Sequence, residues 1–204
     1  MIEFLARVVD SSEYAARVFE VAAHSLFQVL EDEGVLDGTL KPLCQMRSAN
    51  KKHGNVGDVE VIRGKTGLSV LEAWDAKYGK SYLRDELEEL GDKLADHDET
   101  KLAGFVTSGK PDLRKEVRDR IVELEDLYSV TIQVLSFHEW AKQQLERSND
   151  PSVACLDWLT AFAESLCLKR RIRAPIDEPA EAWVRHLCEY AEARLKQKPR
   201  GRSR

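Results

Sequence analysis

The chain has 204 residues, of which 43% are hydrophobic and 33% charged, and its formal net charge at pH 7 is −5. This length suffices for one domain with a substantial core, and no apolar run approaches the roughly 20 residues that span a bilayer. The first residues also lack the basic leader, sustained apolar stretch and small-residue cleavage site of an export signal. We therefore expect a cytoplasmic protein without a membrane segment.

The net negative charge argues against general adhesion to nucleic acid, because Lys and Arg hold the phosphate backbone. Charge is unevenly distributed, however: acidic residues gather in 85–99, and basic residues gather in 47–53, 169–173 and 196–204. One face of the protein could therefore still bind DNA. The four cysteines have no metal-binding spacing, and we expect buried free thiols at Cys44, Cys155, Cys167 and Cys188.

The first half of the chain predicts a helix followed by strands. Apolar residues recur at helical spacing over 11–33, with Ser11 or Ser12 as the cap and Gly34 as the end. A short apolar run over 39–46 contains Pro42 and predicts an edge strand or an extended connection, and 47–55 is a polar loop. Residues 56–63 and 68–78 are rich in Val, Ile and Leu around a Gly-Lys-Thr-Gly turn, which predicts a β-hairpin.

The second half alternates and then becomes helical. A helix capped by Ser81, a strand over 102–107, a charged helix ending near Tyr128 and a strand over 130–135 are predicted in that order. Helices are then predicted over 137–147, 152–168 and 178–196. This order predicts an α/β fold, a mixed sheet flanked by helices with a helical C-terminal part. We expect a core over 1–135, a helical C-terminal subdomain over 136–196 and a basic disordered tail over 197–204.

Two carboxylates and one ammonium are expected at one end of this sheet. Asp75 and Lys77 are two residues apart on one strand and therefore share a face, as do Asp58 and Glu60 on the other strand of the hairpin. The hairpin brings Asp58 beside Asp75. Hard cations such as Mg²⁺ prefer carboxylate oxygens, and Lys77 could orient a water molecule or neutralise charge in a transition state.

The two segments Gly57-Asp58-Val59-Glu60-Val61 and Asp75-Ala76-Lys77 resemble the PD-(D/E)XK nucleases, the superfamily of many type II restriction endonucleases and related repair and resolvase enzymes. Asp58 matches the first acidic residue of the family, and Asp75-Ala76-Lys77 matches its acidic-x-Lys triplet. The family's order of helix, three-strand meander, helix and strand is also similar, and the resemblance covers residues 11–107. The run AWDAKYGK with GDVEV bears a faint similarity to the SacI-type restriction endonucleases.

This chain departs from the family pattern at two positions. Gly57 stands where Pro is usual, and the triplet begins with Asp75 where Glu is commoner.

The resemblance implies a restriction-endonuclease-like fold and a Mg²⁺-dependent endodeoxyribonuclease of the restriction type. Its catalytic residues would be Asp58, Asp75 and Lys77. Many members carry a Glu after an aromatic residue on the first helix, so Phe19-Glu20 makes Glu20 a further catalytic residue and metal ligand; the alternative is a solvated helical Glu. Glu60 is a fourth candidate ligand, unless it lies beyond coordination distance. Cleavage of both strands needs two sites, and we therefore expect a homodimer on double-stranded DNA.

The polar loop that leads into the catalytic strand supplies the predicted DNA contacts, with a solvated loop as the alternative. These contacts are Arg47, Asn50, Lys51, Lys52 and His53. No nucleotide cofactor is expected, because Ser108-Gly109-Lys110 lacks the spacing of a Walker loop. Two other functions remain open: a non-catalytic DNA-binding or assembly subunit of a defence system with a nuclease-like fold, and a protein-binding role for the helical half.

Overall fold

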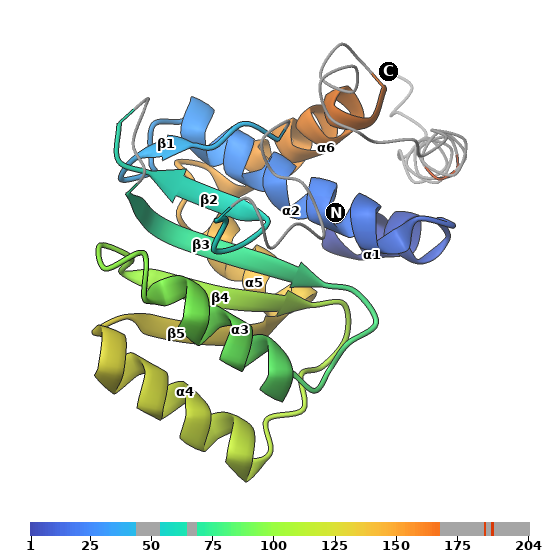
Figure 1. Ribbon diagram of the computed structural model, residues 1–204. Coiled ribbons are helices and arrows are strands. Elements are labelled where there is room, and N and C mark those ends of the chain that lie inside the picture. The colour runs from blue at the N-terminus through green and yellow to red at the C-terminus, as the bar shows by residue number, and fades with distance from the viewer. Residues whose placement is uncertain (44–53, 65–68, 168–185, 187–188, 190–204) are drawn as a thin grey trace, which may run out of the picture.

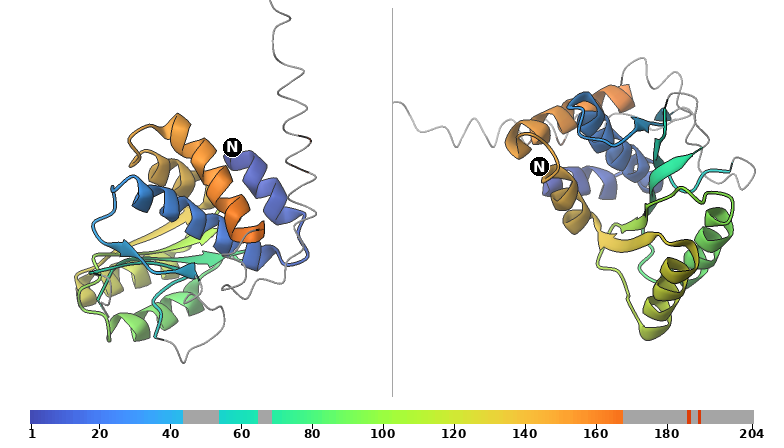
Figure 2. Two further views of the ribbon diagram at one scale, coloured as in Figure 1. Left: turned by 90° about the horizontal axis from the view of Figure 1, so that it is seen from above. Right: turned by 90° about the vertical axis from the view of Figure 1, so that its left-hand side faces the viewer.

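A computed structural model describes residues 1–43, 54–64, 69–167, 186 and 189. In it, a five-stranded mixed sheet lies between two layers of helices (Figure 1). The view from above in Figure 2 shows the three layers edge-on. The expected mixed α/β architecture is thus confirmed. Within the described ranges, no helix is both long and apolar enough to cross a membrane.

The sheet joins an antiparallel half to a parallel half. Its strands lie side by side in chain order: β1 (Thr39–Leu40), β2 (Val59–Ile62), β3 (Val70–Lys77), β4 (Leu102–Thr107) and β5 (Thr131–Ser136). β2 pairs antiparallel with both β1 and β3, with Val59 opposite Trp74, whereas β3, β4 and β5 are parallel. The predicted hairpin is therefore confirmed, and the predicted edge strand is shortened to two residues.

Four helices cover one face of the sheet. They are α1 (Ile2–Asp10), α2 (Ala15–Asp32), α5 (Phe137–Leu145) and α6 (Pro151–Cys167). α2 lies against α6, where the Trp158 indole Nε1 donates a hydrogen bond to the Ala22 carbonyl at 2.9 Å. Phe137 packs edge-on against both Phe19 and Trp158. The described part of the predicted C-terminal subdomain thus shares one apolar core with α2 and the sheet.

The start of the chain differs from the prediction. Residues 2–10 form a helix of their own, with Phe4, Leu5, Val8 and Val9 buried. α2 then begins at Ala15, not at Ser11, because the Ser12 hydroxyl accepts a hydrogen bond from the Tyr14 amide in the intervening turn. Gly34, at φ +70°, follows the end of α2 as predicted.

The opposite face carries α3 (Arg84–Leu94) and α4 (Lys115–Tyr128). The leucine stripe that predicted α3 is buried against Ala103, Phe105 and Ile132 of the parallel strands. Trp74, Trp140 and Trp158 are fully buried core residues. Cys155 is a free thiol but only partly buried, while Trp183 and the side chains of the other three cysteines lie outside the described part.

Gly104 is fixed by the packing of the central strands. A Cβ at this position would lie 2.4 Å from the Trp74 ring and 2.8 Å from the Gln133 carbonyl oxygen. We expect Gly104→Ala to destabilise the protein by about 1–3 kcal/mol, as overpacked core positions do. Urea unfolding measures this loss. Gly109→Ala, where nothing lies within 4 Å of the added Cβ, is the matched control, and equal stability of the two variants would contradict this packing.

Candidate active site

Asp58 and Asp75 lie side by side where β2 begins and β3 ends. The Asp58 amide donates to the Trp74 carbonyl at 2.8 Å, and the Asp58 Oδ2 accepts from the Ala76 amide at 3.0 Å. The two carboxyl groups are within hydrogen-bonding distance of each other. Lys77 Nζ forms an ion pair with Asp75 Oδ2 at 2.8 Å. The hairpin therefore brings these three predicted residues together.

Gly57 permits this close approach of the two strands. A Cβ at position 57 would lie 2.6 Å from the Trp74 carbonyl oxygen. Any larger residue would push the chain away from β3 at the point where the Asp58 amide binds the same oxygen. The glycine that departs from the family pattern thus has a steric reason in this chain.

Glu20 reaches the same group from α2. The residue is only 7% exposed, so the alternative of a solvated helical glutamate is wrong. Arg17, one turn earlier on α2, forms an ion pair with its carboxylate. The charges of Asp75 and Lys77 both act on the Glu20 carboxylate, so Glu20 lies within electrostatic range of the hairpin residues. Arg17 was missed by the sequence analysis, although its i,i+3 spacing from Glu20 signals such a pair.

Burial and the charges of neighbouring carboxylates make Asp58 and Glu20 hard to ionise. Burial raises the pKa of Asp58 well above its usual range, and the neighbouring carboxylates of Asp75 and Glu20 raise it further. Burial also raises the pKa of Glu20, although the Arg17 guanidinium opposes this effect. Each carboxyl therefore gains from a nearby cation.

Lys77 is charged at neutral pH. Burial lowers the pKa of its ammonium group, but the carboxylates of Asp75 and Asp58 outweigh burial and leave the pKa above its usual value. Glu86 of α3, which is 8% exposed and paired with Lys80, adds to this effect. In this metal-free arrangement the Lys77 Nζ is thus a hydrogen-bond donor.

The donor set suits a hard divalent cation. Glu20, Asp58 and Asp75 supply only carboxylate oxygens, and two carboxyl groups in hydrogen-bonding contact need either a shared proton or a cation between them. Within the described ranges, no three His, Cys, Asp or Glu side chains already form a metal-binding group. Glu20 and Asp75 are instead turned toward Arg17 and Lys77, which a divalent cation would have to displace.

Glu60 does not join this group, although it was a candidate ligand. Its carboxylate is fully buried, forms an ion pair with Lys41 Nζ at 2.7 Å and accepts hydrogen bonds from the Val56 and Gly57 amides. Strand alternation predicted the same face for Asp58 and Glu60, but Asp58 precedes β2, in a segment folded over the Glu60 carboxylate. Glu72, on the other face of β3, pairs with Arg147 at 2.8 Å and so has a structural role.

The predicted DNA contacts Arg47, Asn50, Lys51, Lys52 and His53 lie outside the described residues.

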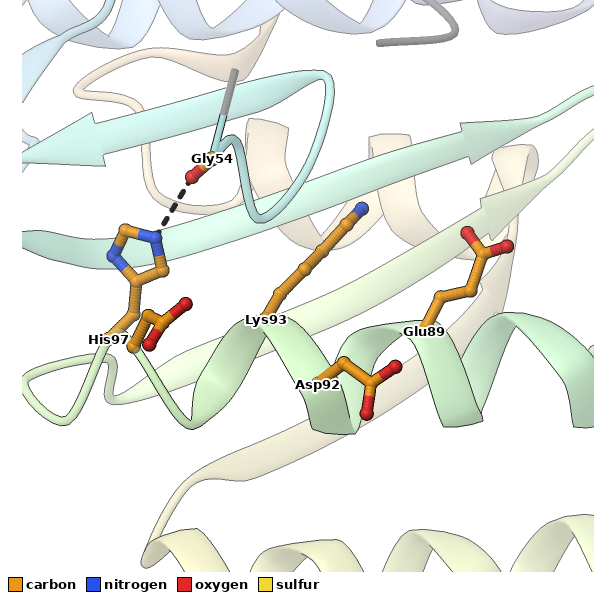
Figure 3. A pocket seen from close by; sticks show the side chains of 6 residues that line it. Gly54, Glu89, Asp92, Lys93 and His97 are labelled. Atoms are coloured by element: carbon orange, nitrogen blue, oxygen red, sulfur yellow. Dashed lines mark hydrogen bonds between the residues drawn. The ribbon is translucent and has the colours of Figure 1, made fainter. Parts of the chain in front are cut away.

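A pocket of about 260 Å³ lies beside Gly54, and its walls contain Gly54, Glu89, Asp92, Lys93, Asp96 and His97 (Figure 3). His97 Nε2 lies 2.9 Å from the Gly54 carbonyl oxygen, and Lys93 Nζ lies 3.3 Å from that of Val56. Three carboxylates in its wall make this pocket unsuitable for a phosphate.

Neither a scan against models of known protein families nor a search of curated proteins finds a match for this chain. The interpretation of the site therefore depends on its own geometry.

Proposed function

We propose that the protein is a Mg²⁺-dependent endodeoxyribonuclease that hydrolyses phosphodiester bonds, of the restriction type, acting in the cytoplasm. The observation that carries the proposal is the convergence of Glu20, Asp58 and Asp75 beside the charged Lys77 at one end of the sheet. Buried carboxylates with an adjacent ammonium group are suited to holding a cation and a phosphate together.

The arrangement of elements supports a restriction-endonuclease-like core. α2, the meander β1–β2–β3, α3 and β4 follow one another in the order that the resemblance implies. The two matching motifs lie on the hairpin of that meander, and Glu20 lies on the helix before it.

Each residue has a distinct part in the proposed reaction. When bound by the three carboxylates, Mg²⁺ would polarise the scissile phosphate and make a water molecule more acidic. The water oxygen forms a bond to phosphorus, the bond from phosphorus to the leaving sugar oxygen breaks, and that oxygen takes up a proton. Lys77, being protonated, donates hydrogen bonds to the attacking water or to the phosphate oxygens, where negative charge develops.

Cleavage of both DNA strands requires two copies of this site. We therefore include a homodimer on double-stranded DNA in the proposal, with the loop residues 47–53 as its predicted contacts.

Purified protein is expected to convert supercoiled plasmid DNA to linear products in Mg²⁺, and a chelator should abolish the reaction. Gel electrophoresis follows the cleavage, and sequencing of the ends tells whether it occurs at defined positions. Plasmids of varied sequence that stay intact in both Mg²⁺ and Mn²⁺ would overturn the proposal.

A non-catalytic DNA-binding or assembly subunit is the second candidate. Arg17 and Lys77 neutralise Glu20 and Asp75 within the chain, an arrangement that a site without metal would keep. Salt-sensitive DNA binding without cleavage, equal in the wild type and in Asp58→Asn, would favour this alternative.

A further inference from the structure

The buried carboxylate of Glu60 binds the segment that leads into Asp58. Glu60 Oε1 accepts hydrogen bonds from the Val56 and Gly57 amides, and its Oε2 pairs with Lys41 Nζ at 2.7 Å. Lys41 Nζ also donates to the Asn55 side-chain oxygen at 2.7 Å. Three consecutive residues before Asp58 are thus tied, directly or through Lys41, to one carboxylate.

The same segment is also held by Val56, which is buried in the apolar cluster that contains the leucines of α3. Lys93 of α3 and His97, three residues after the end of α3, contact the carbonyl oxygens of Val56 and Gly54 respectively. Asp58 itself is joined to the backbone of β3 through the Trp74 carbonyl and the Ala76 amide. The backbone amides at 56 and 57 have their acceptor in Glu60, so loss of that acceptor frees the chain next to Asp58.

We propose that Glu60 is a positioning residue that fixes Asp58 through the 56–57 amides, and that Lys41 fixes Glu60. The proposal deepens the proposed function and rests on it for the role of Asp58. Metal ligands are commonly oriented by neighbouring groups through hydrogen bonds, and loss of such a neighbour typically weakens metal binding 10- to 100-fold. We expect Glu60 to have this effect on Asp58.

Glu60→Gln tests the proposal, because an amide cannot accept from both backbone amides and keep its pair with Lys41. We expect the dissociation constant for Mn²⁺, measured by electron paramagnetic resonance without DNA, to rise at least about tenfold. Amide hydrogen exchange at Ala76, which donates to Asp58 Oδ2, should quicken in the metal-free protein.

Glu72→Gln is the matched control. Glu72 is also an acidic residue that is largely shielded from solvent. It forms an ion pair with Arg147 and accepts a hydrogen bond from the Trp74 indole. It lies on the other face of β3, so its loss should reduce stability while leaving Mn²⁺ affinity and the exchange of the Ala76 amide as in the wild type.

Lys41→Met separates positioning from direct metal binding. If Glu60 positions Asp58, loss of Lys41 loosens the carboxylate and weakens Mn²⁺ binding. If Glu60 were itself a ligand, loss of its competing cation would strengthen binding, and that result would overturn the proposal. Should either single variant fail to fold, the double variant Lys41→Met/Glu60→Met buries no unpaired charge, has no acceptor for the 56–57 amides and is expected to show the same loss.

The two proposals fail in different ways. Normal Mn²⁺ affinity in Glu60→Gln, together with lost affinity in Asp58→Asn, would overturn the role of Glu60 and keep the metal site. Equal Mn²⁺ binding in the wild type and Asp58→Asn would remove the metal role of Asp58. In that case unchanged Ala76 exchange in Glu60→Gln would overturn the positioning role as well.

Discussion

Lys77→Met is expected to lower kcat for DNA cleavage by about 10²- to 10³-fold, the range for removal of one donor that stabilises transition-state charge. Methionine keeps much of the length of the side chain but removes the ammonium group. Asp75 would lose its partner at 2.8 Å, so Mg²⁺ should bind as well as before or more tightly. A large loss of kcat without loss of metal affinity is the signature of this role.

Single-turnover cleavage at saturating Mg²⁺ measures the rate of DNA cleavage, and Mn²⁺ binding measures the metal affinity. Lys101→Met, at the opposite end of the parallel strands, removes an exposed lysine and should leave both unchanged. Cleavage at the wild-type rate by Lys77→Met would show that the nuclease activity comes from another site.

Asp58→Asn is expected to stabilise the metal-free protein at neutral pH by about 0.5–2 kcal/mol, the usual range for one stabilising substitution. Asn keeps an oxygen for the Ala76 amide but has no charge to repel Asp75 and Glu20. Since Mg²⁺ would lose a ligand, the stabilisation of the wild type by Mg²⁺ should be reduced or absent in the variant.

The stability of the metal-free protein should change with pH in a defined direction. Because the pKa of Asp58 is raised above the ordinary value of 3.8, the folded state holds its proton over a range where the unfolded state has released it. Asp58 therefore makes the metal-free wild type less stable as pH rises through that range, and the contribution disappears in Asp58→Asn. Protonation also competes with a cation, so Mg²⁺ affinity should fall as pH falls.

Thermal unfolding from pH 4 to pH 8, with and without Mg²⁺, measures both effects. Asp119→Asn, which removes an exposed carboxylate from α4, is the control and should follow the wild type. A less stable Asp58→Asn at neutral pH, or an undiminished response of this variant to Mg²⁺, would contradict the arrangement of charges described above.

The hairpin and its motif residues could be predicted because their signals are local. Alternating Val and Ile residues around a glycine-bounded turn specify two paired strands, and a spacing of two places Asp75 and Lys77 on one face. The pairing of Val59 with Trp74 then brings Asp58 to Asp75 without further information. Glu20 was found only through the resemblance, since a single helical Glu has no local signal of burial.

The roles of Glu60 and Arg17 depend on contacts that periodicity does not encode. Alternation gave Glu60 the face of Asp58 but not the folded segment whose amides occupy its oxygens. The helix over 2–10 was missed because those residues were considered only as an export signal, although Phe4, Leu5, Val8 and Val9 repeat at helical spacing. The packing of α6 on α2 is a contact between distant parts of the sequence, which no short window contains.

That packing has a consequence for how the protein is made. α2 emerges early in synthesis, but the apolar side that α6 covers, including the contact of Trp158 with the Ala22 carbonyl, is not completed until more than a hundred further residues have been added. Glu20 lies on this helix, so the helix that carries it is fully packed only when α6 completes the core. A nascent chain attached to its ribosome would therefore present the hairpin and α2 with the α6-facing side of α2 still uncovered.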